Sequence, residues 1–241
     1  MKKLSLRSLV PNLITFISLT LGLSAIKFAF ENKWQIAVAL VVFSSFLDNL
    51  DGKLARFLKT NSNFGVELDS LADFISFGVA PAIIVYLWSK SIFFDTNWAI
   101  VIFYAICSSS RLAKFNVLSH ENKTDSISLK FFSGISTPAA AGLSLLPLMI
   151  YFRFEINISE YEYFLKFYLF LPSILMISNI PTYSLKGLKI DKKLIPLVIA
   201  LFASFTYLLL TDIWLAMTCL IITYFLSIPF AVYESKVSLK V

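Results

Sequence analysis

Four aspartates lie close together in the sequence. Asp48 and Asp51 are three residues apart, Asp69 and Asp73 are four apart, and all lie within 26 residues of largely apolar sequence. Spacings of three and four place each pair on one face of a helix. A polar break near residues 59–64 predicts that the two helices form an antiparallel hairpin, so that the two pairs face each other.

Such a cluster points to a bound divalent cation. In a membrane, each carboxylate costs about 2.5–3.5 kcal/mol on insertion scales, so the cluster needs a positive partner. Lys53 and Arg56 could neutralise two of the acids, although both side chains can extend toward water. Oxygen ligands suit Mg²⁺ or Mn²⁺, and a pair of such ions would suit a diphosphate substrate. His120 is the only histidine, which argues against zinc.

The aspartates also have purely structural interpretations. Acidic residues can cap a helix or favour its N-terminus through the helix dipole. The small residues Gly52, Ala55 and Gly65 could serve helix packing alone, or could allow a ligand to come close.

The surrounding sequence is that of a membrane protein. Of the 241 residues, 58% are hydrophobic and only 15% are charged, with a mean hydropathy of +0.78. Apolar runs of about 18 or more residues recur along the chain, and each could cross a bilayer. This composition excludes an ordinary soluble domain and a disordered chain. Cys107 and Cys219 lie far apart in apolar runs, so no disulfide framework is expected.

Hydropathy and polar breaks predict an all-α fold, a polytopic membrane bundle of about eight transmembrane helices. The expected ranges are 12–30, 34–58, 65–88, 97–118, 133–151, 161–183, 193–210 and 213–234. Little chain remains outside them, which favours one membrane domain over residues 1–241. Residues 1–11 are predicted to lie along the membrane interface, with Pro11 opening the first crossing helix and no cleaved signal peptide.

The basic residues predict the orientation. Alternating the sides of the predicted spans places 16 of the 21 lysines and arginines on the side of the N-terminus. The positive-inside rule then puts both termini and the aspartates on the cytoplasmic side of the cell (inner) membrane. This rule also accounts for the net charge of +6, so no nucleic acid partner is expected.

The aspartates belong to a longer pattern, D-x2-D-G-x2-A-R-x8-G-x3-D-x3-D, in which every fixed position is met over residues 48–73. This pattern resembles the signature of the CDP-alcohol phosphatidyltransferases, and eight fixed positions with fixed gaps make the match specific. The resemblance implies transfer of a phosphatidyl group from a CDP-linked lipid to an alcohol, with CMP released.

The same resemblance implies roles for the motif residues. Asp48, Asp51 and Asp69 would hold two divalent ions, Mg²⁺ or Mn²⁺. Asp73 would also touch one ion and would act as the general base for the attacking hydroxyl. The residues implied to contact the CDP part of the donor are Gly52, Ala55, Arg56, Ser62 and Gly65. Membrane lipids surround the protein, and a homodimer is the expectation from the family.

Two downstream segments bear on the acceptor alcohol. Residues 111–116 (RLAKFN) and 132–141 (FSGISTPAAA) are similar to segments of the bacterial and archaeal phosphatidylserine synthases in this family. Lys114 and Ser136 depart from that pattern, where an arginine and a proline are usual. The resemblance implies CDP-diacylglycerol and L-serine as substrates, and phosphatidylserine and CMP as products.

Three residues are candidates for the acceptor site. Arg111 and Lys130 could bind the serine carboxylate or a lipid phosphate, since both carry donors suited to anions. Lys130 could equally be a basic loop residue that only reports topology. Asn116 could orient the acceptor or cap its helix.

Two alternatives remain open from the sequence. Another acceptor, such as glycerol 3-phosphate or inositol phosphate, would carry a phosphate and favour more arginines than Arg56 and Arg111 provide. A divalent-cation transporter would also place acids in a membrane. The acids here lie at one predicted face, however, and no second acidic cluster marks an exit path.

Overall fold

The structure is a computed structural model that describes residues 6–58, 62–92, 98–120, 131–156, 161–183 and 192–238. Six of its helices are long and apolar enough to cross a membrane, which confirms a polytopic membrane bundle. These spans are Leu9–Phe30, Trp34–Leu58, Asn63–Ile92, Trp98–Val117, Thr137–Phe154 and Ile213–Lys236. The other two predicted spans form shorter apolar helices over Tyr163–Ile177 and Ile195–Thr211.

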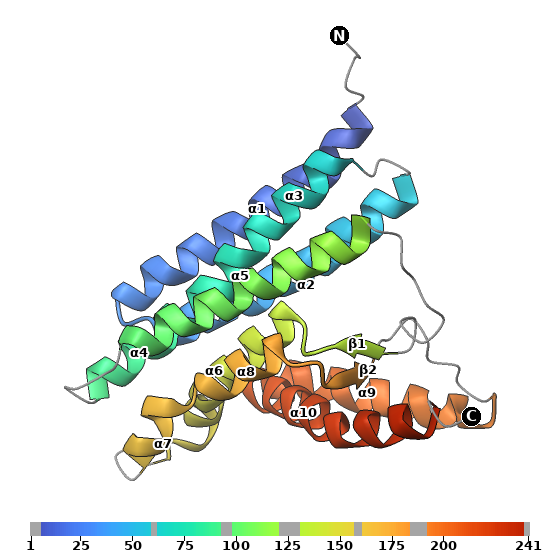
Figure 1. Cartoon of the computed structure of the whole chain (residues 1–241). Helices are drawn as coiled ribbons and strands as arrows, with labels where there is room; N and C mark the ends of the chain where they lie inside the picture. The colour runs from blue at the N-terminus through green and yellow to red at the C-terminus, as the bar shows by residue number, and fades with distance from the viewer. Residues whose placement is uncertain are drawn as a thin grey trace.

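Figure 1 shows the elements of the described residues coloured in chain order. They are α1 (Leu6–Phe30), α2 (Trp34–Leu58), α3 (Asn63–Asp73), η1 (Phe74–Val79), α4 (Ala80–Ile92), α5 (Trp98–His120), β1 (Phe131–Ser133), α6 (Thr137–Phe154), α7 (Glu162–Phe167), α8 (Phe170–Ile177), β2 (Pro181–Tyr183), η5 (Lys192–Leu194), α9 (Ile195–Thr211) and α10 (Ile213–Ser238).

Several helix boundaries differ from the prediction. Helix α1 begins at Leu6, so Pro11 lies inside the helix rather than at its start. The helix predicted over 161–183 is interrupted between α7 and α8 and ends at Ile177. These differences arise because hydropathy reports how apolar a segment is, whereas helix ends depend on local hydrogen bonds.

The fold also departs from a purely helical one. Strands β1 and β2 pair antiparallel, with Phe131 opposite Tyr183 and Ser133 opposite Pro181. Residue 133 was predicted to start a helix, but α6 begins at Thr137 after the side chain of Ser136 accepts a bond from Ala139 N. The ribbon joins two segments nearly fifty residues apart, a pairing that no local sequence pattern reveals.

A π-helical segment, η1, follows Asp73 directly and joins α3 to α4. The wider turn breaks the regular spacing of the helix that carries two of the aspartates. Such segments are rare and often accompany functional sites. The buried hydroxyl of Tyr104 on α5 donates a 3.1 Å hydrogen bond to the carbonyl of Phe77 and ties η1 to the core.

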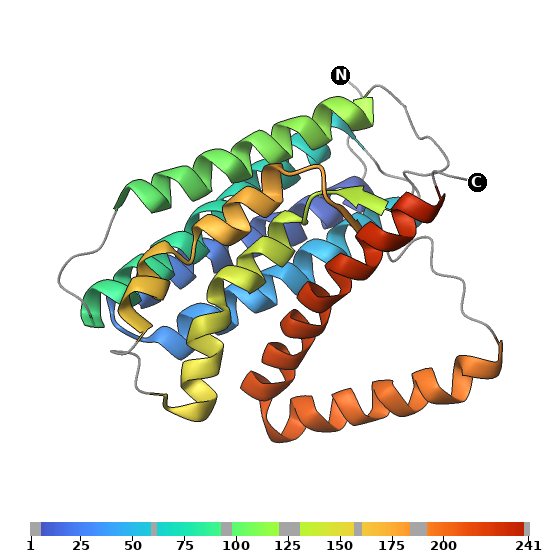
Figure 2. The same ribbon diagram turned by 60° about the horizontal axis from the view of Figure 1, so that its bottom comes forward.

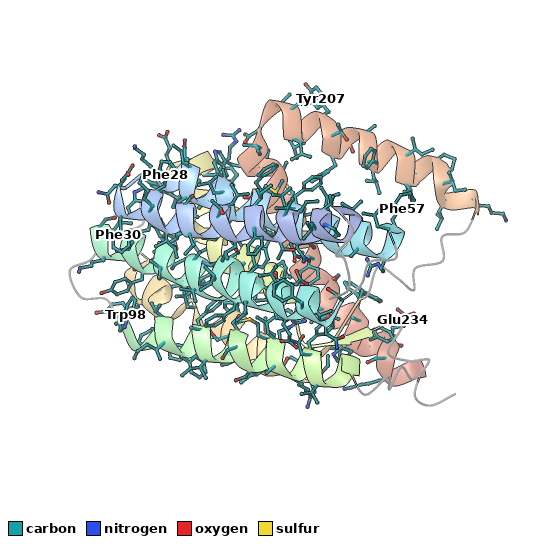
Figure 3. The ribbon with its side chains drawn as sticks, turned by 90° about the horizontal axis from the view of Figure 1, so that it is seen from above. Phe28, Phe30, Phe57, Trp98, Tyr207 and Glu234 are labelled. Carbon is teal, nitrogen blue, oxygen red and sulfur yellow. The ribbon has the colours of Figure 1, made fainter. Side chains whose placement is uncertain are left out.

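The described helix ends fall into two groups. The start of α1, the end of α2, the start of α3 and the β1–β2 ribbon lie at one end of the bundle, here called the motif end (Figure 2). Phe57 marks this end in Figure 3, whereas Phe28, Phe30 and Trp98 mark the opposite, far end.

Helix α9 lies apart from the bundle; it meets α10 at the turn that joins them and then diverges from it (Figure 2). None of its residues is buried, and the side chain of Tyr207 points outward from it (Figure 3). The core lies instead between α1, α2, η1, α4, α5 and α6, where Phe77, Tyr104 and Leu145 are fully buried.

Candidate active site

The predicted hairpin brings the first three motif acids together. Asp48 and Asp51 near the end of α2 and Asp69 on α3 each offer a carboxylate oxygen, and these oxygens lie within 4.8 Å of one another. Asp51 is only 4% exposed, whereas Asp48 and Asp69 are half-buried. Helical spacing explains why each helix presents its acids on one face, and the antiparallel hairpin explains why the faces meet.

Asp73 completes the cluster from the last residue of α3. Its half-buried carboxyl group lies within hydrogen-bonding reach of Asp48, as does that of Asp69. The predicted meeting of the two aspartate pairs is therefore confirmed, because the two helices place all four acids at one site.

The cluster has the features of a cation site. Among the described residues, no lysine or arginine forms an ion pair with any of the four acids. The buried Oδ1 atom of Asp69 has no hydrogen-bond partner. Unpaired buried carboxylate oxygens are costly, and a hard divalent cation would satisfy them with the ligand type it prefers. The donor set therefore fits Mg²⁺ or Mn²⁺, and Asp48, Asp51 and Asp69 could bind such an ion.

The glycines of the motif differ in their surroundings. A Cβ added to Gly52 would meet no atom of the described residues within 4 Å, so none of their backbone lies against it. A Cβ added to Gly65 would lie 3.2 Å from both Asn12 Oδ1 and Ser62 Oγ. Gly52 thus leaves room for a ligand, while Gly65 lies in a packed contact with α1.

The polar motif residues lie at the edge of the site. Ser62 is the N-cap of α3, and its Oγ accepts a 3.0 Å hydrogen bond from Gly65 N. Its hydroxyl donates no hydrogen bond to a described residue. Arg56 is exposed and has no ion pair among the described residues, while Ala55 is half-buried.

Arg111 on α5 reaches the same site from the other side. Its Nε donates to the carbonyl of Ile135, and its Nη1 donates to Thr137 Oγ1 at 3.2 Å. The half-buried guanidinium also interacts electrostatically with Asp73. The turn before α6 therefore anchors an arginine that interacts with the aspartate cluster, and its other N–H groups form no hydrogen bond to a described residue.

Of the two remaining acceptor candidates, Asn116 and Lys130, the structure describes only Asn116. Asn116 contacts α3, accepting a hydrogen bond from Ser70 and donating one to Glu67. It does not cap α5, because that helix continues to His120. Lys130 lies outside the described residues.

One contact of the site was not predicted. Thr15 on α1 donates a hydrogen bond of 2.7 Å to Asp51 Oδ2. Thr15 lies 36 residues before Asp51, and α1 carries several other hydroxyl side chains, so no signal in the sequence singled out Thr15.

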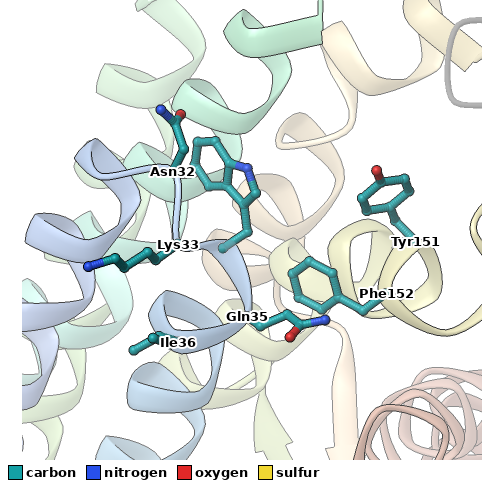
Figure 4. Close-up of a pocket in the computed structure, with 7 residues that line it drawn as sticks. Asn32, Lys33, Gln35, Ile36, Tyr151 and Phe152 are labelled. Atoms are coloured by element: carbon teal, nitrogen blue, oxygen red, sulfur yellow. The ribbon is translucent and has the colours of Figure 1, made fainter.

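A cavity of about 380 Å³ lies at the far end of the molecule (Figure 4). It is lined by Asn32, Lys33, Trp34, Gln35, Ile36, Tyr151 and Phe152. Lys33 is paired with Glu31 at 2.7 Å, and no motif residue contributes to the lining. The cavity is therefore separate from the aspartate site.

Fold and site together define a multi-pass membrane protein with an acidic cation-type centre at one end of its bundle. The chain belongs to the CDP-alcohol phosphatidyltransferase family, whose sequence model matches residues 8–229. It is therefore an enzyme of phospholipid synthesis. This membership decides against the cation transporter.

The chain is also similar to three individual members of this family. A CDP-diacylglycerol–serine O-phosphatidyltransferase of Mycobacterium tuberculosis is 34% identical over 228 residues, which cover 95% of this chain and 79% of that protein. One from Helicobacter pylori is 38% identical over 191 residues, covering 79% and 78%. One from Methanocaldococcus jannaschii is 34% identical over 134 residues, covering 55% and 56%.

Proposed function

We propose that this enzyme transfers the phosphatidyl group of CDP-diacylglycerol to L-serine, giving phosphatidylserine and CMP. The observation that carries the proposal is the convergence of the four aspartates beside the anchored guanidinium of Arg111. The acids suit the diphosphate of the donor, and the arginine suits the carboxylate of an amino acid acceptor. The names of the similar proteins support serine as that acceptor.

Asp48, Asp51, Asp69 and Asp73 would hold two divalent ions, Mg²⁺ or Mn²⁺. When bound, these ions would neutralise charge on the diphosphate and on the departing CMP. The protein would contribute the fixed positions of the carboxylates, which come from two packed helices rather than from loops. Rigid placement of this kind lowers the barrier by holding the reactants in line.

The serine hydroxyl oxygen would attack the phosphorus bonded to the diacylglycerol oxygen. A new P–O bond forms there, the bond to CMP breaks, and the hydroxyl proton passes to Asp73 as general base. The residues proposed to contact the CDP part of the donor are Gly52, Ala55, Arg56, Ser62 and Gly65. The room that the described residues leave beside Gly52 and the exposure of Arg56, which forms no ion pair with a described residue, support this placement.

Arg111 would bind the serine carboxylate, because its guanidinium interacts electrostatically with Asp73 and carries donors suited to a carboxylate. Lys130 would add a second cation to the acceptor or to a lipid phosphate. Asn116 contacts α3 and would act on the acceptor only through that helix.

The whole chain is proposed to be one membrane domain with eight crossings, in which α7–α8 and α9 supply the two shorter ones. The basic residues support an orientation with both termini and the aspartate site in the cytoplasm. Serine and CMP would then exchange with cytoplasmic water, while the lipid substrate and product stay in the surrounding bilayer. A homodimer is proposed as the assembly.

The test is a CMP-release assay with purified protein, CDP-diacylglycerol and Mn²⁺, with serine or another alcohol as acceptor. We expect CMP release to require both the metal and serine, with phosphatidylserine as the lipid product. Release of CMP with glycerol 3-phosphate or inositol phosphate, but not with serine, would overturn serine as the acceptor. The activity of the family would remain.

A further inference from the structure

Helix α1 lies against the aspartate site beside α2 and α3, although it carries no residue of the motif. The hydroxyl of Thr15 lies 2.7 Å from Asp51 Oδ2 and 3.1 Å from the carbonyl of Pro11. A hydroxyl has one hydrogen, and the shorter contact with a carboxylate is the stronger of the two. Thr15 and Asp51 are 5% and 4% exposed, so water does not compete for this bond.

The position of Thr15 is set by three buried serines that meet one turn further along α1. Ser18 Oγ and Ser44 Oγ on α2 lie 2.7 Å apart, and Ser76 Oγ on η1 donates to the Ser18 carbonyl at 3.2 Å. All three hydroxyls are buried. Buried hydrogen bonds of this kind allow little sliding, because a shift of α1 would leave several polar groups unpaired.

Close backbone packing strengthens this placement. A Cβ added to Gly22 on α1 would lie 2.4 Å from Ser76 Oγ, so α1 approaches η1 more closely than a larger residue would permit. Near its start, α1 packs against α3, and a Cβ added to Gly65 would lie 3.2 Å from Asn12 Oδ1. Helix α1 therefore touches both halves of the motif and is fixed relative to each.

We propose that Thr15 is a positioning residue for the cation site. Its hydroxyl holds Oδ2 of Asp51 and thereby sets the carboxylate in one orientation toward Asp48 and Asp69. The inference rests on the proposed function in that a divalent cation occupies this cluster. Hydrogen bonds to metal-binding side chains typically contribute about 10–100-fold to metal affinity.

The experiment measures Mn²⁺ binding directly, by electron paramagnetic resonance of free Mn²⁺ during titration of the detergent-solubilised full chain. Thr15→Val removes the hydroxyl with little change of shape, and Thr15→Ser keeps it. Thr20→Val is the matched control. Thr20 lies on the same helix, is exposed, and donates only to the Phe16 carbonyl at 2.8 Å.

We expect Thr15→Val to weaken Mn²⁺ binding about 10–100-fold. Thr15→Ser and Thr20→Val should bind as the unmodified chain does. Equal Mn²⁺ affinity in Thr15→Val, or an equal loss in Thr20→Val or Thr15→Ser, would overturn the role of this hydroxyl. Failure of the unmodified chain to bind Mn²⁺ would instead refute the proposed cation site itself.

Thermal unfolding without metal separates positioning from folding. Thr15→Val should unfold within about 10 °C of the unmodified chain, because the loss of a single hydrogen bond to a charged group lowers the Tm of a chain of this size only moderately. If the loss of Mn²⁺ affinity appears only together with a collapse in thermal stability, then the positioning role is rejected.

Discussion

The hydroxyl of Ser70 on α3 donates a hydrogen bond of 3.1 Å to Oδ1 of Asn116 on α5. Ser70 follows Asp69 directly in the chain, and the Asn116 amide also donates to Glu67 Oε2 at 3.4 Å. Asn116 therefore holds α3 at the level of the aspartates. This contact gives the side chain a role distinct from direct binding of the acceptor.

A double-mutant cycle tests this role. Ser70→Ala and Asn116→Ala should each lower kcat about fivefold, since a lost side-chain hydrogen bond costs about 1 kcal/mol. The double variant should be no slower than the slower single variant, because both remove one shared contact. A raised KM for serine in Asn116→Ala alone would instead indicate direct acceptor binding.

Asp73→Asn should lower turnover about 100- to 10,000-fold, the usual contribution of a general base. The amide keeps the shape of the side chain but cannot take the proton of the serine hydroxyl. CMP release measures turnover, and calorimetric binding of CDP-diacylglycerol shows whether the donor site persists. Normal turnover with normal donor binding would exclude Asp73 as the base.

Divalent ions should stabilise the folded protein. A ligand at 100 times its Kd adds about 2.7 kcal/mol to the free energy of unfolding. The Tm of the unmodified chain should therefore be higher with Mg²⁺ than with a chelator. Asp69→Asn should raise the Tm in chelator, because it removes one of four crowded acids. The same variant should lose most of the rise with Mg²⁺.

Glu155→Gln is the control for this measurement. Glu155 is exposed at the end of α6, at the far end of the bundle. Its Tm should respond to Mg²⁺ as that of the unmodified chain does. A Tm that does not change with Mg²⁺ in any of these proteins would contradict the cation site.

Two glycines should respond oppositely to alanine. Gly134 has a φ of +73°, and an added Cβ would lie 2.8–2.9 Å from the carbonyls of Met176, Leu175 and Ser178. Gly134→Ala should destabilise the fold by about 1–3 kcal/mol, because this backbone conformation and the clash both oppose a side chain. Gly52→Ala should raise the Tm slightly, because alanine is favoured over glycine by about 0.5–1 kcal/mol inside a helix and no described residue has an atom within 4 Å of the added Cβ.

The two variants also differ in their kinetics. Gly52→Ala should raise the KM for CDP-diacylglycerol, since its methyl group would enter space proposed for the donor. An unchanged donor KM would show that this space is not used. A Gly134→Ala variant with an unchanged Tm would contradict the tight turn before α6.

Arg111→Lys should raise the KM for serine about tenfold or more, because hydrogen bonds to charged groups contribute about 1.5–3 kcal/mol. A lysine keeps the charge but cannot bind the Ile135 carbonyl, Thr137 and a carboxylate with one planar group. The KM for CDP-diacylglycerol is the internal control and should not change. A selective rise in the donor KM would assign Arg111 to the lipid phosphate instead.

The class of protein and the meeting of the four aspartates could be predicted from the sequence. Long apolar runs, the charge asymmetry and the spacing of Asp48, Asp51, Asp69 and Asp73 are local properties, and helical periodicity converts them directly into spans and shared faces. The structure confirms the predicted meeting of these acids.

The contacts that hold these groups in place depend on the tertiary structure. The Thr15–Asp51 bond, the β1–β2 ribbon, the anchoring of Arg111 and the Ser70–Asn116 contact all join residues far apart in the chain. Such pairs depend on how helices pack and on which buried polar groups find partners, and neither is encoded in a local period. The sequence by itself thus determined which residues could react, and only the packing of α1, α5 and the turn before α6 decided how they are held.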